Sequence, residues 1–146
     1  MRIYVASSWR NERQPKVVTA LRKRGHDVYD FREASTSFDW RAVATKAQLT
    51  SPRKFRDEVL FKLAGVFDAF MADMGAIRNA DATVLVLPCG RSAHLELGFA
   101  VANGQKTVVL LDDPLSEPEI MYLAASHVCV TLAEAVAQFP RLKGRR

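Results

Sequence analysis

Cysteine and histidine, which form most zinc sites, are scarce in this sequence. It has two cysteines, Cys89 and Cys129, and three histidines, and none of them lies in a CxxC or Cys/His metal-binding spacing. Each cysteine ends or interrupts an apolar run, which predicts a reduced thiol in or near the core. We therefore expect no structural zinc ion.

Long apolar segments are also lacking. No run approaches the roughly 18 residues that a membrane-spanning helix needs. The first residues, Met1 to Ala6, are too short and too soon polar for a secretory signal. These features predict a cytoplasmic protein that has no membrane partner.

The sequence also lacks a surface typical of nucleic-acid binding. Much of the net charge of +5 comes from a helix end, Arg22 to Arg24, and from a basic tail at about residues 141–146. Aromatic residues do not alternate with basic ones on any predicted face, so we do not expect nucleic acid as the partner. A small phosphorylated or carboxylated substrate suits such a basic protein at least as well.

What is present is an alternation of short apolar runs and helical patterns over 146 residues, a length that fits one domain with a single core. The strands are expected at 3–6, 26–31, 81–87, 106–111 and 127–130. The run 81–87 is apolar on both faces, as in a central parallel strand. The pattern predicts an α/β fold: a doubly wound, mostly parallel five-stranded sheet with helices on both faces, Rossmann- or flavodoxin-like.

Turn and capping residues predict the connections between these strands. Gly25 ends a helix that starts at Gln14, Ser51-Pro52 starts a helix, and two helices meet near Gly65. Ser92 is expected to cap the helix after the central strand. Residues 33–50 are polar and broken, which predicts a surface loop carrying Phe38 and Trp40. Short final helices are expected at 118–125 and 132–139.

Ligands of such sheets bind beyond the carboxyl ends of the strands. Three segments are expected there: Ser7, Ser8, Trp9 and Arg10 after the first strand, residues 88–92 after the central strand, and Asp112-Asp113 after the next. Hydroxyls, an arginine and free N–H groups at a helix start suit a phosphate or a carboxylate. The first loop lacks GxGxxG and GxxxxGK[ST], so it is neither a dinucleotide fingerprint nor a P-loop; an ordinary capped turn is the alternative.

Glu96 is the main catalytic candidate. It is the only charged residue of the stretch Ala93 to Ala102, which is apolar nearly all round and is therefore expected to be buried on most sides. A buried carboxylate needs a partner, a cavity or a chemical role. The alternative is a surface glutamate that compensates the helix dipole.

Three other side chains are candidates for the same site. Asp73 lies in a mainly apolar helical stretch shortly before the central strand, and its alternative is a solvent-facing position. Phe38 and Trp40 are candidates for stacking on a planar base, the alternative being that they anchor their loop. His94 is expected on the helix surface or behind the ligand-contacting residues.

The segment from Gly90 through Arg91 and Ser92 to Glu96-Leu97-Gly98-Phe99-Ala100 resembles the nucleoside 2-deoxyribosyltransferase family. In that family the glutamate of Glu-Leu-Gly-x-Ala is the nucleophile, which implies this role for Glu96. An aspartate on the preceding helix takes part in catalysis there, and Asp73 stands in the matching place. The segment Ser8 to Arg13 is similar to the Ser-x-Arg-x-x-Arg pattern of 2'-deoxynucleoside 5'-phosphate N-hydrolases, in which the serine and first arginine hold the 5'-phosphate.

Two positions depart from these families. Gly90 stands where relatives often have an aspartate or serine that touches the sugar or phosphate, with Arg91 and Ser92 close by. Glu119 stands where relatives place an asparagine or serine that reaches into a neighbouring subunit's site. A carboxylate at that position would repel a phosphate.

The resemblance implies cleavage or transfer of the N-glycosidic bond of a nucleoside or nucleoside 5'-monophosphate through a covalent glycosyl–Glu96 intermediate, without any cofactor. The alternatives are a non-catalytic nucleotide-binding or sensing domain, a hydrolase of another N-glycoside such as a nicotinamide dinucleotide, and a plain interaction module. Relatives are usually dimers or larger. The apolar residues Val66, Phe67, Phe70 and Met71 look exposed and suit a subunit contact.

Overall fold

The structure is a computed structural model that describes residues 1–34 and 39–142. Phe38, one of the two predicted base-stacking residues, lies outside the described residues. The chain forms two compact units: Met1–Asp30 with Ala76–Arg146, here called the sheet unit, and Phe31–Gly75, here called the helical unit.

Five parallel strands form the sheet, in the order β2-β1-β3-β4-β5. Their bounds are Arg2–Ala6 (β1), Asp27–Tyr29 (β2), Ala82–Val86 (β3), Lys106–Leu110 (β4) and His127–Cys129 (β5). β3 lies at the centre and is buried along its whole length, because helices cover both of its faces. The predicted fold class and the central strand are therefore confirmed.

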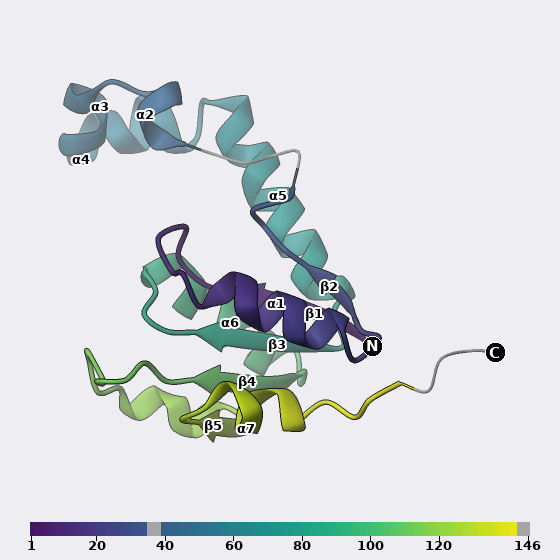
Figure 1. Cartoon of the computed structure of the whole chain (residues 1–146). Helices are drawn as coiled ribbons and strands as arrows, with labels where there is room; N and C mark the ends of the chain where they lie inside the picture. The colour runs from purple at the N-terminus through teal and green to yellow at the C-terminus, as the bar shows by residue number, and fades with distance from the viewer. Residues whose placement is uncertain (35–38, 143–146) are drawn as a thin grey trace. The chain divides into compact units, whose positions relative to one another are not determined.

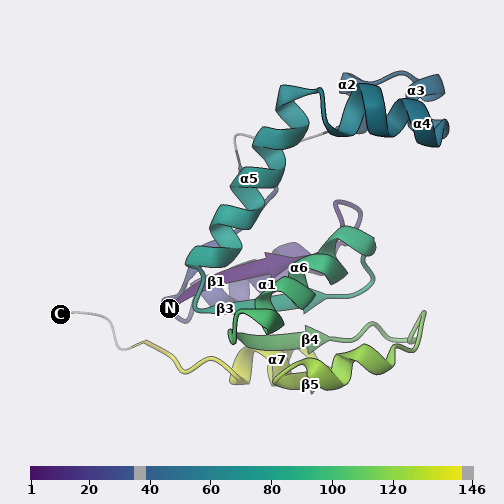
Figure 2. The same cartoon turned by 180° about the vertical axis from the view of Figure 1, so that it is seen from behind.

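Helices cover both faces of this sheet (Figures 1 and 2). α1 (Gln14–Arg22) and α7 (Leu132–Ala137) lie on one face, and α6 (Arg91–Ala102) lies on the other. Alternate strand residues point to opposite faces. Ile3 and Val5 of β1 therefore join the core beneath α1 and α7. The 3-10 helix η2 (Ile120–Ala124) precedes β5.

Local sequence explains where α1 begins and ends. Pro15 lies in its first turn, where a missing N–H costs nothing, and Val17, Val18 and Leu21 form its buried stripe. The chain leaves the helix through Gly25, whose φ of 89° strains any residue with a Cβ. The predicted end at Gly25 is confirmed.

Two predictions for α6 are wrong. Its N-cap is Gly90, and Ser92 lies exposed in the first turn, because Arg91 already has helical geometry. The helix also buries one face only, through Ala93, Leu97 and Ala100. The sheet covers that face, whereas Leu95 on the outside is 76% exposed. The apolar composition of α6 therefore reflects two surfaces, a buried stripe against the sheet and an apolar outer face that nothing in the described part of the chain covers.

The helical unit contains α2 (Trp40–Val43), α3 (Lys46–Thr50), α4 (Pro52–Lys54), a π-helix η1 (Phe55–Leu60) and most of α5 (Ala64–Asn79). The predicted surface loop over 33–50 is thus wrong in its second half. Asp39 caps α2 by accepting from Arg41 N at 3.0 Å, and Thr45 forms a capping box with Gln48. These local caps allow short helices in a polar segment.

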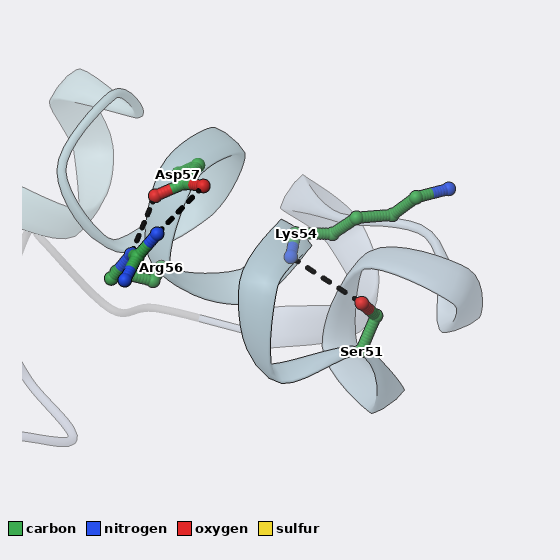
Figure 3. Close-up of polar contacts among 4 residues, drawn as sticks. All are labelled: Ser51, Lys54, Arg56 and Asp57. Carbon is green, nitrogen blue, oxygen red and sulfur yellow. Dashed lines mark hydrogen bonds and ion pairs between the residues drawn. The ribbon is translucent and has the colours of Figure 1, made fainter.

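Two further features of the helical unit bear on the predictions. Ser51 Oγ accepts from Lys54 N at 3.4 Å, which confirms the predicted helix start (Figure 3). The break between the two later helices falls before Ala64, so Gly65 lies inside the first turn of α5. Of the four apolar residues expected on its surface, Phe67, Phe70 and Met71 are exposed and Val66 is buried.

No helix in the described part of the chain is both long and apolar enough to cross a membrane.

Candidate active site

The candidate site lies where β1 and β3 meet at the carboxyl edge of the sheet. The chain runs outward from β1 to β2 on one side and from β3 to β4 on the other. Such a reversal of strand order separates the loops that follow the two neighbouring strands, and ligands of open α/β sheets bind there. Ser7 follows β1, and residues 87–90 follow β3.

Two side chains connect the loop after β1 to the end of β3. Ser7 Oγ donates to the carbonyl oxygen of Val86 at 2.8 Å. Asn11, which is buried, donates through Nδ2 to the carbonyl oxygens of Val86 and Pro88, each at 3.0 Å. Ser7 is a predicted ligand residue, but its hydroxyl proton is already donated to a backbone carbonyl of the sheet unit.

The two arginines of the first loop have different surroundings. Arg13 Nη1 donates to the carbonyl oxygens of Leu87 at 3.1 Å and Leu111 at 2.8 Å. Arg10 is exposed, and its backbone N–H donates to Ser8 Oγ at 3.3 Å. Arg13 therefore has a structural contact with two strand ends, and Arg10 is the arginine whose side chain faces solvent. The neighbouring Trp9 is 50% exposed.

Glu96 is half-buried on α6, the second turn from its start. Its carboxylate acts on Cys89: burial, and then the negative charges of Glu96 and Asp112, raise the pKa of the Cys89 thiol to about 12. Glu96 and Asp112 therefore both lie within electrostatic reach of Cys89 at this edge of the sheet. A raised pKa also means that Cys89 is a thiol, and hence a poor nucleophile, at neutral pH.

Asp112 supplies a second carboxylate from the loop after β4. Burial alone would raise the pKa of Asp112, but hydrogen bonds from Ser116 and the positive charge of Arg13 outweigh it and lower that pKa. The backbone N–H of Ser116 donates to Asp112 Oδ2 at 3.2 Å. Asp112 is therefore ionised at neutral pH and adds negative charge to the site.

His94 connects α6 to η2. Its Nε2 lies 2.9 Å from the hydroxyl of Tyr122, and its Nδ1 lies 2.9 Å from the carbonyl oxygen of Gly90 and 3.6 Å from Cys89 Sγ. The rings of His94 and Tyr122 are stacked, with centroids 5.9 Å apart. Tyr122 is buried, so the imidazole lies between a buried phenol and the loop after β3.

The other predicted ligand residues of the sheet unit are exposed: Gly90, Arg91, Ser92 and Glu119. Glu119 is the N-cap of η2 and accepts from Met121 N at 2.9 Å. Its negative charge contributes to the raised pKa of Tyr122, which is mainly due to burial. Glu119 therefore acts on the site electrostatically from its rim.

Two predicted residues belong to the helical unit. Asp73 is half-buried on α5, and Trp40 packs on Phe55 with ring centroids 5.5 Å apart. Trp40 therefore contributes to the packing of its own unit. A shallow depression in this unit is lined by Arg56, Asp57, Phe61 and Lys62 and contains none of the predicted residues. Arg56 and Asp57 pair there through two hydrogen bonds (Figure 3).

Within residues 1–34 and 39–142, no group of three or more His, Cys, Asp or Glu side chains is arranged to hold a metal ion.

The sequence matches no protein-family model and no curated protein. Among solved structures, a 2-deoxyribosyltransferase from the psychrotolerant bacterium Bacillus psychrosaccharolyticus is similar with a TM-score of 0.65 and 21% identity, over 97% of each chain. This chain has the 2-deoxyribosyltransferase fold.

Two further structures have the same fold. A CMP N-glycosidase from Clostridium botulinum is similar with a TM-score of 0.54 and 15% identity, over 94% of this chain and 97% of that one. A conserved protein from Enterococcus faecalis V583 has a TM-score of 0.53 and 16% identity, over 99% of this chain and 91% of that one. The 2-deoxyribosyltransferase fold therefore extends over nearly the whole of this chain.

Sequence reasoning missed part of the site. Tyr122 was not singled out, because nothing in a short helix marks a tyrosine that meets a histidine 28 positions earlier. Cys89 was interpreted as a thiol in or near the core, and its place within electrostatic reach of Glu96 was not foreseen. The structural role of Asn11 had one available signal: an asparagine just before a helix is typical of a turn that its side chain stabilises.

Proposed function

We propose that this protein cleaves or transfers the N-glycosidic bond of a nucleoside or nucleoside 5'-monophosphate, with Glu96 as the nucleophile. The observation that supports this most directly is a half-buried carboxylate at the carboxyl edge of a sheet with the 2-deoxyribosyltransferase fold. The two similar structures with a described activity, a 2-deoxyribosyltransferase and a CMP N-glycosidase, act on the same kind of bond.

In the proposed reaction, a Glu96 oxygen attacks the anomeric carbon of the sugar. The bond from that carbon to the base nitrogen breaks, and its electron pair leaves with the base, which takes up a proton. A water oxygen or the nitrogen of a second base, which gives up a proton, then attacks the same carbon, and the bond to Glu96 breaks with its electron pair returning to the carboxylate. Because the transition state gains positive charge on the sugar, the fixed negative charges of Glu96 and Asp112 stabilise it.

The family resemblance gives Asp73 the role of protonating or hydrogen-bonding the departing base. This role stays a proposal. Asp73→Asn keeps the shape of the side chain and removes its acidity, and it is expected to slow the release of poor leaving groups, such as unprotonated purines, more than that of good ones. Equal slowing of all leaving groups would contradict the role.

The deciding experiment incubates the purified protein with a panel of nucleosides, deoxynucleosides, their 5'-monophosphates and a nicotinamide dinucleotide, and measures the released base by chromatography. A second base is added in parallel, so that a newly formed nucleoside distinguishes transfer from hydrolysis. Glu96→Gln is expected to lower turnover by roughly 10³-fold or more. Asp27→Asn, an exposed position at the amino end of β2, is the control.

Full turnover by Glu96→Gln would exclude the proposed nucleophile. If no member of the panel releases a base but calorimetry detects nucleotide binding, the protein is a binding domain of the same fold. If nicotinamide is the one base released, the substrate is the nicotinamide dinucleotide and not a nucleoside or its monophosphate.

We also infer that a second copy of the chain covers the outer surface of α6 and η2. Large apolar side chains are highly exposed there: Leu95 at 76%, Ile120 at 80%, Met121 at 67% and Leu123 at 91%. The His94–Tyr122 hydrogen bond holds α6 and η2 together, so these residues lie on adjoining elements. An exposed apolar surface of this kind is typical of a subunit interface.

A further inference from the structure

Three side chains contact carbonyl oxygens of the loop that joins β3 to α6. The carbonyl oxygen of Leu87 accepts from Arg13, that of Pro88 accepts from Asn11, and that of Gly90 lies 2.9 Å from His94 Nδ1. Arg13 and Asn11 come from the loop after β1, whereas His94 belongs to α6 itself. The third contact is therefore the one that ties this loop to the helix that carries Glu96.

We propose that His94 and Tyr122 are positioning residues: the chain of hydrogen bonds from Tyr122 through His94 to Gly90, here called the His94 clamp, holds the loop 88–90 and the start of α6 in the conformation that binds the sugar. This inference rests on the proposed function and deepens it. It assigns roles to two residues that do not themselves touch the reacting bond.

Hydrogen-bond chemistry determines where the protons of the His94 clamp lie. A carbonyl oxygen only accepts, so the contact with Gly90 requires the proton on Nδ1 of His94. In the neutral ring Nε2 then has a lone pair, and the hydroxyl of Tyr122 must donate to it. Burial, together with the nearby negative charges, raises the pKa of Tyr122 to about 12, so the phenol retains the proton that it donates.

The clamp acts at a position without a side chain of its own. Gly90 is the N-cap of α6, and it has no hydroxyl or carboxylate with which to cap the helix. Its backbone φ of −91° and ψ of −174° are open to any residue, and a Cβ placed there would meet nothing within 4 Å. There is therefore room for a side chain at position 90. Because glycine is flexible, the contact from His94 restrains the backbone at this position.

The consequence for catalysis concerns binding more than the chemical step. Glu96 lies in the second turn of α6, which is also held by the packing of Ala93, Leu97 and Ala100 on the sheet. The loop 88–90, by contrast, depends on its side-chain contacts. Loss of the clamp is therefore expected to raise KM more than it lowers kcat. One lost hydrogen bond of about 1.4 kcal/mol corresponds to a tenfold fall in kcat/KM.

Three variants separate the two hydrogen bonds. Tyr122→Phe keeps the ring and removes the hydroxyl. His94→Asn places an amide nitrogen near the position of Nδ1 and retains the bond to Gly90, whereas His94→Gln reaches toward Tyr122 and loses Gly90. We expect KM to rise in the order wild type, His94→Asn, His94→Gln. His127→Asn, an exposed histidine on β5, is the matched control and should leave KM unchanged.

Two measurements test the His94 clamp without any enzymatic activity. Nitrogen-15 NMR of the histidine side chains should show His94 with the proton on Nδ1 in the wild type, and a mixture of tautomers in Tyr122→Phe. Cys89 Sγ lies 3.6 Å from His94 Nδ1, so its reaction with a thiol reagent reports on the loop. Alkylation of Cys89, located by mass spectrometry, should become severalfold faster in Tyr122→Phe and His94→Gln.

The outcomes distinguish this inference from the proposed function. If the wild type releases no base from any substrate, the proposed function fails, while the tautomer and the thiol rate still decide whether the clamp exists. If base is released but Tyr122→Phe and His94→Gln keep the wild-type KM, the positioning role is wrong although the function stands. A proton on Nε2 of His94 in the wild type would also overturn the clamp.

Discussion

Arg13 and Leu111 join the loop after β1 to the end of β4: Nη1 of the arginine donates to the carbonyl oxygen of the leucine at 2.8 Å. The same nitrogen donates to the carbonyl oxygen of Leu87 at 3.1 Å, so one guanidinium holds the ends of two neighbouring strands. The carboxyl edge of the sheet is therefore fixed before any substrate binds.

Replacement of Arg13 by alanine should destabilise the protein. Two carbonyl oxygens in part-buried positions would lose their donor, and the unfolding free energy is expected to fall by about 1–3 kcal/mol. Urea denaturation followed by circular dichroism measures this change. Lys16→Ala, an exposed position on α1, is the control and should stay within about 0.5 kcal/mol. An equally small effect for Arg13→Ala would show that these contacts do not stabilise the edge.

The charge of Glu119 should disfavour phosphorylated substrates. The carboxylate caps η2 by accepting from Met121 N, and an asparagine can retain such a cap while removing the charge. Because Glu119 is exposed, its charge is screened, and we expect Glu119→Asn to raise kcat/KM for a nucleoside 5'-monophosphate relative to its nucleoside by roughly three- to tenfold. The ratio should vary with salt. An unchanged ratio would show that the phosphate binds beyond the reach of Glu119.

Self-association should depend on the outer surface of α6 and η2. Leu95 and Leu123 are 76% and 91% exposed, so the double change Leu95→Gln and Leu123→Gln removes little packing within one chain. We expect it to dissociate the oligomer in analytical ultracentrifugation. Phe70→Gln, at a 56% exposed position of α5, tests the surface that the sequence had indicated. Dissociation by Phe70→Gln alone would move the interface to the helical unit.

The unfolding free energy should fall in mildly acidic solution because of His26. Burial lowers the pKa of this side chain from its ordinary 6.5, and the positive charges of the amino terminus and Arg24 lower it further, against a weaker opposing effect of the backbone at Pro140 and Phe139. The folded protein thus binds this proton less readily than the unfolded chain. The contribution of neutral His26 to the unfolding free energy is fully present above pH 6.5, the ordinary pKa of histidine. It is lost as the pH falls through the lowered pKa of the folded protein.

The measurement compares the unfolding free energy of wild type and His26→Gln between about pH 7.5 and about pH 5, a range that spans the ordinary histidine pKa. The variant should show a smaller loss over that range, because it has no group to protonate at this position. His127→Asn replaces an exposed histidine and should keep the wild-type dependence. Parallel curves for all three proteins would contradict the assignment.

Local sequence was sufficient for the sheet. Val84, Leu85 and Val86 are apolar on both faces of one strand, and only a central parallel strand buries both faces, so the position of β3 followed from its composition. Gly25 ended α1 for a reason that lies in its own backbone. These features depend on interactions within a few residues or on the period of the chain.

The sequence could not show which apolar surfaces are covered or which distant polar groups meet. Leu97 packs on the sheet and Leu95 does not, although both are leucines of the same helix. The difference lies in the direction that each side chain takes from the helix. His94 and Tyr122 are 28 positions apart, and only the packing of η2 beside α6 brings their polar atoms to 2.9 Å. Composition and periodicity therefore determined the sheet and its order of elements, whereas the contacts that shape the site were decided by the tertiary structure.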